Sequence, residues 1–81
     1  SSFITKTMFD YSIQDINKIK PGIAESTRVM LRRIPRLLVL KDKNSTDVSH
    51  LKVLATEKNI MIKEEPLMPF SAMAFIENVK E

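Results

Sequence analysis

The residues whose types and spacing could do chemistry lie in one stretch, KIKPGIAESTRVMLRRIPRLLVLK, at positions 18–41. It contains the only glycine of the chain, Gly22, which follows Pro21 and precedes a basic segment. A helix that begins here would present free backbone N–H groups and a partial positive charge, and both attract phosphate. A lone glycine is not the G-x-G-x-x-G of a dinucleotide-binding loop, so we do not expect that type of loop.

Positive charge is concentrated in residues 18–43. This segment carries eight lysines and arginines against two carboxylates, a net charge of +6, whereas the remaining residues carry −3 and the whole chain +3. A clustered positive field suits a polyanionic partner such as RNA, and a solvated helix face is the plain alternative.

Glu25 and Arg28 lie three residues apart, so a helix places them on one face. Two interpretations stay open for them. They form a surface ion pair with each other, or they both contact RNA. In the second case Glu25 accepts a hydrogen bond from a guanine edge, and Arg28 binds guanine or phosphate with both arms of its guanidinium.

Other cations surround the same turn. Arg32, Arg33 and Arg36 would contact flanking phosphates, which adds affinity and salt dependence rather than sequence choice. Lys18 and Lys20 would join them from the other side of the turn. A plain surface role stays open for several of these side chains.

The composition argues against catalysis. The chain has no cysteine, which excludes a disulfide scaffold, a zinc-thiolate site and a cysteine nucleophile. The only histidine, His50, lacks a cluster of carboxylates at metal-ligand spacing and is expected to be packed or at the surface. Ser26 has no histidine-and-acid relay near it. We therefore expect no enzyme activity, metal, cofactor or small-molecule substrate.

Length and hydropathy predict a single domain over residues 1–81, with a core small enough to depend on a partner. A hydrophobic content of 43% with 28% charged residues fits a globular protein. Neither a run of about 18 apolar residues nor a signal-peptide pattern is present. We expect no membrane partner and a cytosolic or nuclear setting.

The N-terminal part is expected to hold a strand and a helix. Residues 1–7, with their β-branched character, read as a short edge strand or a frayed end. Over residues 8–18, Phe9, Ile13 and Ile16 recur at helical spacing and predict one apolar helix face.

A second helix is expected over residues 23–33, because the apolar spacing is helical and Pro35 stops it. Its predicted buried face carries Ile23, Thr27, Met30 or Leu31, and Ile34.

The remaining chain is expected to alternate strands with one helix. The apolar run 36–41 predicts a strand buried on both faces. A helix over 45–58 with a serine or threonine cap follows, and Asn59 suits its exit. Strands are expected over 60–63 and 70–77. The fold class is therefore α/β, a three-layer α/β/α sandwich with a small mixed sheet of about four strands.

Three pieces of the sequence, taken in order, resemble one family. The pieces are KIKPGIAESTRVM, RRIPRLLVLKDK and HLKVLATEKNI, and they cover about residues 18–62. They are similar to the kink-turn RNA-binding superfamily of ribosomal and small nucleolar ribonucleoprotein proteins, typified by the archaeal large-subunit protein L-seven-Ae. Its members open the RNA-contacting helix with Lys/Arg-Gly-x-Asn-Glu-x-Thr-Lys, which Gly22, Glu25, Thr27 and Arg28 match here.

The resemblance and the charge pattern together nominate ten residues for RNA binding. They are Lys18, Lys20, Gly22, Ile23, Ala24, Glu25, Arg28, Arg32, Arg33 and Arg36. Ala24 stands where most family members have an asparagine that hydrogen-bonds to sheared guanine–adenine pairs, and its methyl group is neither donor nor acceptor.

The loop before the last strand also departs from the family, which has a longer loop and a further helix there. Glu64 and Glu65 would repel phosphate. Leu67 and Met68, between two prolines, are expected to be exposed and available to a neighbouring macromolecule.

We expect a noncatalytic RNA-binding subunit of a ribonucleoprotein particle. The resemblance favours a ribosomal protein on structured, kink-turn-like rRNA in the cytoplasm, with other proteins of the particle as partners. A box H/ACA or box C/D small nucleolar particle, or RNase P/MRP, is the alternative assembly, with a nucleolar setting. An alternative of another class is a protein–protein interaction module that has lost specific RNA recognition, which Ala24, Glu64 and Glu65 favour.

Overall fold

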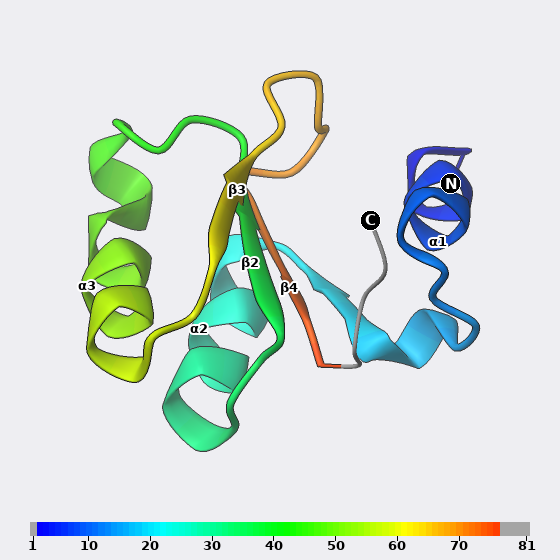
Figure 1. The fold of residues 1–81 in the computed structure, drawn as a ribbon. Helices are drawn as coiled ribbons and strands as arrows, with labels where there is room; N and C mark the ends of the chain where they lie inside the picture. The colour runs from blue at the N-terminus through cyan, green and yellow to red at the C-terminus, as the bar shows by residue number, and fades with distance from the viewer. Residues whose placement is uncertain (1, 77–81) are drawn as a thin grey trace.

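The computed structural model describes residues 2–76 (Figure 1). In chain order the elements, with η marking short 3₁₀ helices, are α1 (Ser2–Tyr11), η1 (Ile16–Lys18), β1 (Ile19–Pro21), α2 (Ile23–Arg32), β2 (Leu37–Leu40), η2 (Thr46–Val48), α3 (Ser49–Lys58), β3 (Ile62–Glu64) and β4 (Ala72–Phe75). In this described part of the chain, no helix is long and apolar enough to cross a bilayer.

The four strands form one mixed sheet in the order β1-β4-β2-β3. β2 and β3 are parallel, and β4 runs antiparallel to both β1 and β2. β1, β2 and β3 therefore point the same way, and α2 and α3 are the crossovers between them. Both crossovers step in the same direction across the sheet, so right-handed connections place both helices on one face. α1 covers the other face (Figure 1), which confirms the predicted three layers.

β2 divides the core into two halves, because its side chains alternate between the faces. Leu37 and Val39 pack with Met73 and Phe75 on the α1 side. The two remaining leucines of β2 pack with apolar residues of α2 and α3 on the opposite side. Every residue of β2 is buried, as the run 36–41 predicted.

The predicted end of the 45–58 helix is confirmed, and its predicted start was wrong. α3 begins at Ser49 after Val48 and has no side-chain cap. The side chain of Ser45 accepts a hydrogen bond from the N–H of Asp47 and caps η2, which leads directly into α3. Asn59 adopts the left-handed conformation at φ 56° and ends α3. The strands over 60–63 and 70–77 are shorter than predicted, and position 77 lies outside the described residues.

The predictions for the N-terminal part were wrong. Instead of a strand over 1–7 and a helix over 8–18, α1 occupies Ser2–Tyr11. Ile4, Thr7 and Tyr11 are its buried residues, and this helical spacing outweighs the β-branched character that suggested a strand.

The chain leaves α1 at Ser12, whose φ of 57° is left-handed. Phe9 is 85% exposed and Ile16 54%, so Phe9, Ile13 and Ile16 do not share a buried helix face. The segment that follows forms η1 and then β1, a strand that the periodicity did not predict.

Two further burial predictions were wrong. Ile34 is 70% exposed, because α2 packs on the sheet through Ser26, Val29 and Met30. Of the alternatives Met30 and Leu31, Met30 is the buried one and Leu31 is 64% exposed. Met68 is fully buried, since the 65–71 loop folds it back into the α1 side of the core. Its neighbour Leu67 is 91% exposed, as predicted.

Candidate nucleic-acid interface

The Gly22 junction joins β1 to α2 and is held on both sides by the backbone. The N–H of Gly22 donates to the carbonyl of Ala72 in β4 at 2.8 Å, and the N–H of Ser26 donates to the carbonyl of Gly22 at 2.9 Å. The buried hydroxyl of Ser26 donates to the carbonyl of Lys20 at 3.4 Å. These bonds fix the turn before any partner arrives.

Glycine is required at this turn by its backbone angles. Gly22 has φ 98° and ψ 153°, a region that is open almost only to glycine. A Cβ built there meets no atom within 4 Å, so the constraint comes from the backbone and not from crowding.

The N-terminus of α2 lacks a capping side chain, because its N-cap residue is Gly22. The opening N–H groups of the helix, at Ile23, Ala24 and Glu25, therefore find no side-chain acceptor at the cap. Ala24 is exposed, so this end of the helix is open to a ligand. The arrangement is the anion-attracting helix start that the sequence predicted.

Glu25 and Arg28 form an ion pair with each other on the surface of α2. Both side chains are about half exposed, so the pair contributes only about 0.3 kcal/mol to stability. In the free protein the two side chains therefore pair with each other, which is the first of the two interpretations. The structure also leaves both groups within reach of a partner that offers better hydrogen bonds.

β1 carries Lys20 toward the junction and leaves Lys18 at the far end of the strand. Lys20 lies opposite Ala74 in the register of β1 and β4, so it projects on the face covered by α2. Lys18 precedes β1 at the end of η1, and its carbonyl accepts a hydrogen bond from the N–H of Ile76. The N–H of Arg36 donates to the adjacent Phe75, so Lys18 lies at the same end of the sheet as Arg36.

The remaining nominated arginines lie at the other end of α2. Arg32 is in its last turn, Arg33 is the C-cap, and Arg36 precedes β2. All three are exposed. A helix of 10 residues is about 15 Å long, so the structure separates the ten nominated residues into two groups. Lys18 belongs with the three arginines at the C-terminal end of α2, because it and Arg36 bond to the neighbouring residues Ile76 and Phe75.

The sequence analysis missed residues at the junction that come from distant segments. Because Ala72 lies between Gly22 and Leu40, the ends of β1 and β2 meet the start of β4 at one sheet edge. The N–H of Lys41 donates to the carbonyl of Ser71 at 3.1 Å there. Only the strand order, which single-sequence patterns do not reveal, brings these residues together.

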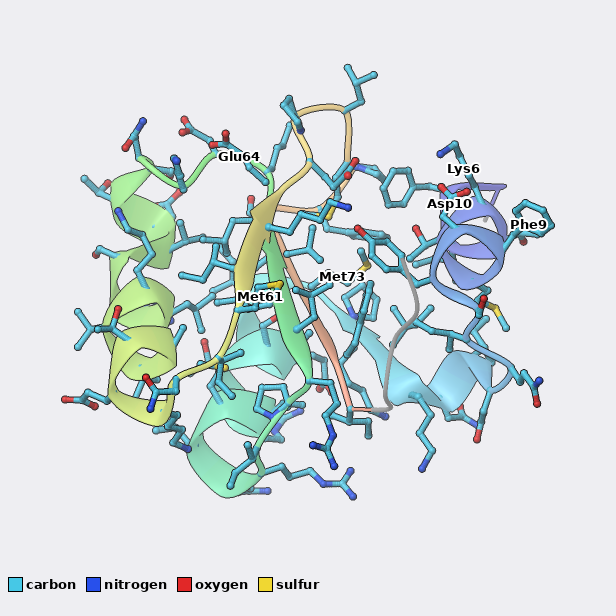
Figure 2. The ribbon with its side chains drawn as sticks, in the orientation of Figure 1. Lys6, Phe9, Asp10, Met61, Glu64 and Met73 are labelled. Atoms are coloured by element: carbon cyan, nitrogen blue, oxygen red, sulfur yellow. The ribbon has the colours of Figure 1, made fainter. Side chains whose placement is uncertain are left out.

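A cavity of about 510 Å³ opens at this edge, lined by Lys41, Asp42, Ser45, Val48, Glu64, Pro66 and Ser71. The Glu64 carboxylate accepts a hydrogen bond from the N–H of Lys43 at 2.9 Å. Glu64 stands at the end of β3, beside the loop that follows β2 and contains Lys43 (Figure 2). One of the two predicted phosphate-repelling carboxylates is thus engaged with the protein's own backbone.

His50 is a surface residue, as expected. Its Nε2 lies 2.8 Å from the hydroxyl of Thr27, a contact that links α3 to the middle of α2. The same hydroxyl donates a hydrogen bond to the carbonyl of Ile23 within α2 at 2.7 Å. The contact between His50 and Thr27 therefore supports the spacing of α2 and α3.

A second cavity, of about 330 Å³, lies under α1 on the opposite face of the sheet. Tyr11 lines it, and the buried hydroxyl of Tyr11 has no hydrogen-bond partner. At its rim the Lys6 ammonium donates to Asp10 at 2.5 Å, and this hydrogen bond and the charge of Asp10 raise the pKa of Lys6. Figure 2 shows both side chains on α1, away from the basic segment. No cluster of metal-ligating side chains occurs among residues 2–76.

Comparison with known proteins decides the family. A profile of the PELOTA RNA binding domain matches residues 1–78. The chain belongs to the PELOTA RNA binding domain family. The predicted resemblance to RNA-binding proteins is thereby confirmed at the level of an RNA-binding domain.

One curated relative, the "Cysteine protease StiP" of Acinetobacter baylyi (strain ATCC 33305 / BD413 / ADP1), is 36% identical over 78 residues. The match covers 94% of this chain and 20% of that protein, so the chain spans about a fifth of the length of the relative.

Proposed function

We propose that this domain binds structured RNA through the N-terminal end of α2 and the lysines of the preceding segment. The observation that supports this most directly is the Gly22 junction. There the uncapped N–H groups of α2 lie beside Lys20 and ahead of Arg28, in a member of an RNA-binding family. The helix start and the lysines together favour a phosphate group at this position.

Each residue of the proposed interface has a role that its chemistry allows. The N–H groups of Ile23 and Ala24 would donate to phosphate oxygens. Arg28 would exchange its ion pair with Glu25 for guanine or phosphate, which frees the Glu25 carboxylate to accept from a guanine amino group. Lys18 and Lys20 would neutralise the flanking backbone.

We propose kink-turn-like ribosomal RNA as the target, with the domain at work in a ribonucleoprotein particle in the cytoplasm. The match of the Gly22–Arg28 run to the kink-turn superfamily supports this choice. Small nucleolar and RNase P/MRP particles are the alternative assemblies, with a nucleolar setting. In each case the domain binds and does not catalyse.

A second candidate function follows from the relative named a cysteine protease. There the matching segment is a fifth of a longer protein, so the domain would serve as the RNA-binding module of a larger polypeptide. The 81 residues contain no cysteine and cannot themselves provide a cysteine nucleophile.

The test is a titration of a labelled kink-turn RNA with the protein, followed by fluorescence anisotropy, beside a plain hairpin of equal length. We expect tighter binding to the kink-turn, and a loss of about tenfold or more in Arg28→Ala. Lys6→Ala is the matched control, because it removes a cation from α1 on the opposite face, and it should change the affinity less than about twofold. If both RNAs bind with equal affinity and Arg28→Ala leaves that affinity unchanged, the protein–protein interaction module is favoured instead.

A further inference from the structure

The C-terminal end of α2 exposes two large aliphatic side chains between arginines. Leu31 is 64% exposed and Ile34 is 70% exposed. They are three residues apart, so their Cα atoms lie within about 11 Å of each other. We name Leu31, Arg33, Ile34 and Arg36 the distal patch. Apolar residues rimmed by charge in this way are typical of interaction sites rather than of an inert surface.

The charges of the distal patch are not used within the domain. Among residues 2–76, neither Arg33 nor Arg36 forms an ion pair with a carboxylate. Their backbone groups are engaged, since the N–H of Arg33 donates to Val29 and that of Arg36 donates to Phe75. The main chain is therefore fixed, and both side chains are exposed to solvent.

The chemistry of the distal patch fits protein better than RNA. Proteins hold unpaired bases by stacking on aromatic rings or arginine planes, and an exposed leucine and isoleucine offer no stacking surface and no hydrogen bond. A protein segment can cover aliphatic side chains and pair with arginine at the same time, and arginine is enriched at such interfaces.

We propose that the distal patch docks an acidic, amphipathic protein segment. Its carboxylates pair with Arg33 and Arg36, and its apolar side chains cover Leu31 and Ile34. Charge complementarity selects an acidic occupant. The 36% identical relative shows that a domain of this kind occurs within a much longer polypeptide, where such a segment can come from the same chain. The distal patch lies about 15 Å along α2 from the Gly22 junction.

The test uses a synthetic amphipathic peptide of leucine and glutamate, labelled with fluorescein and titrated with the 81-residue chain. We expect a dissociation constant of tens of micromolar, and a loss of about tenfold in the double variant Leu31→Ser with Ile34→Ser. Arg33→Gln with Arg36→Gln should cause a similar loss. Lys41→Gln with Lys43→Gln removes the same charge beyond the opposite end of β2, where the N–H of Lys41 donates to Ser71, and should change peptide binding less than about twofold.

Three results would overturn the proposal. The first is no peptide binding up to about 1 mM, which corresponds to an interaction too weak to be specific. The second is an equal loss in the Lys41 and Lys43 variant, which would mean attraction by net charge alone. The third is a tenfold loss of kink-turn RNA affinity in the Leu31 and Ile34 variant, which would assign the patch to RNA. A failure of the RNA proposal itself would show only in the RNA titrations, so the two proposals fail separately.

Discussion

Both ends of α2 carry cations, and they differ in the backbone beside them. At the N-terminal end, Lys20 lies toward uncapped N–H groups, where the helix dipole adds to its positive charge. At the C-terminal end, Arg32 and Arg33 stand next to terminal carbonyl groups, where the dipole opposes it. The Lys58 ammonium also donates to the Met30 carbonyl there. Equal charge therefore does not make equal anion sites, and the direction of the helix decides which end favours phosphate.

The largest expected effect comes from removing two charges on one side or the other. Lys20→Gln with Arg28→Gln should weaken RNA binding by about thirtyfold and lower the slope of log affinity against log salt by about 2. Arg33→Gln with Arg36→Gln should weaken it by less than about fivefold. Salt-dependent anisotropy titrations measure both. Equal losses would remove the distinction between the two ends.

Gly22→Ala tests whether the rigid turn itself distinguishes the N-terminal end. The backbone angles of Gly22 disfavour any side chain, so we expect the free energy of unfolding to fall by about 1 to 3 kcal/mol. Denaturant unfolding measures it. Asn59→Gly is the control, because a left-handed position outside the junction should tolerate glycine with little change. An unchanged stability in Gly22→Ala would show that the turn can relax.

Ala24→Asn tests whether the N-terminal end of α2 can recognise particular base pairs. If the site reads sheared guanine–adenine pairs, the restored amide should tighten kink-turn binding by about fivefold, the value of one additional hydrogen bond. A kink-turn RNA with those pairs replaced by Watson–Crick pairs is the control and should show no gain. Absence of any gain on the standard RNA would mean that the target has another shape.

The smallest effect concerns the contact that holds the middle of α2 between its two ends. His50→Ala removes the hydrogen bond to Thr27 and should lower the free energy of unfolding by about 0.5 kcal/mol, because the contact is exposed. Thermal unfolding measures it, and RNA and peptide affinities should both stay unchanged. Any selective loss of one affinity would show that the two ends communicate through this contact.

The sequence predicted the second half of the fold well, and the reasons are local. The run 37–40 is apolar throughout, Pro35 stops α2, and Asn59 ends α3. These signals act within a few residues, so single-sequence patterns carry them. The helical spacing of Ile4, Thr7 and Tyr11 is equally local and prevails in α1, although the β-branched character of the first residues had favoured a strand in the prediction.

The rest of the fold and of the candidate site depends on pairing over long distances. β1 has only three residues and is a strand because β4 pairs with it. No local sequence pattern predicts such a short strand. Met68 is buried by the course of its loop. The division of the nominated arginines between two ends follows from helix length, but the exposure of Leu31 and Ile34 follows from which face of α2 meets the sheet.

The position of β4 has a consequence for synthesis of the chain. Among residues 2–76, β4 is the last strand in chain order, yet it lies between β1 and β2 and is the strand that pairs with β1. Ile19 therefore pairs only after Phe75 has been made, and the Gly22 junction closes only with the carbonyl of Ala72. A nascent chain that emerges from N- to C-terminus cannot assemble this junction until β4 has left the ribosome, because each earlier intermediate exposes an unpaired β1 and an open edge of β2. The Gly22 junction is thus complete only in a chain that has been synthesised through residue 75.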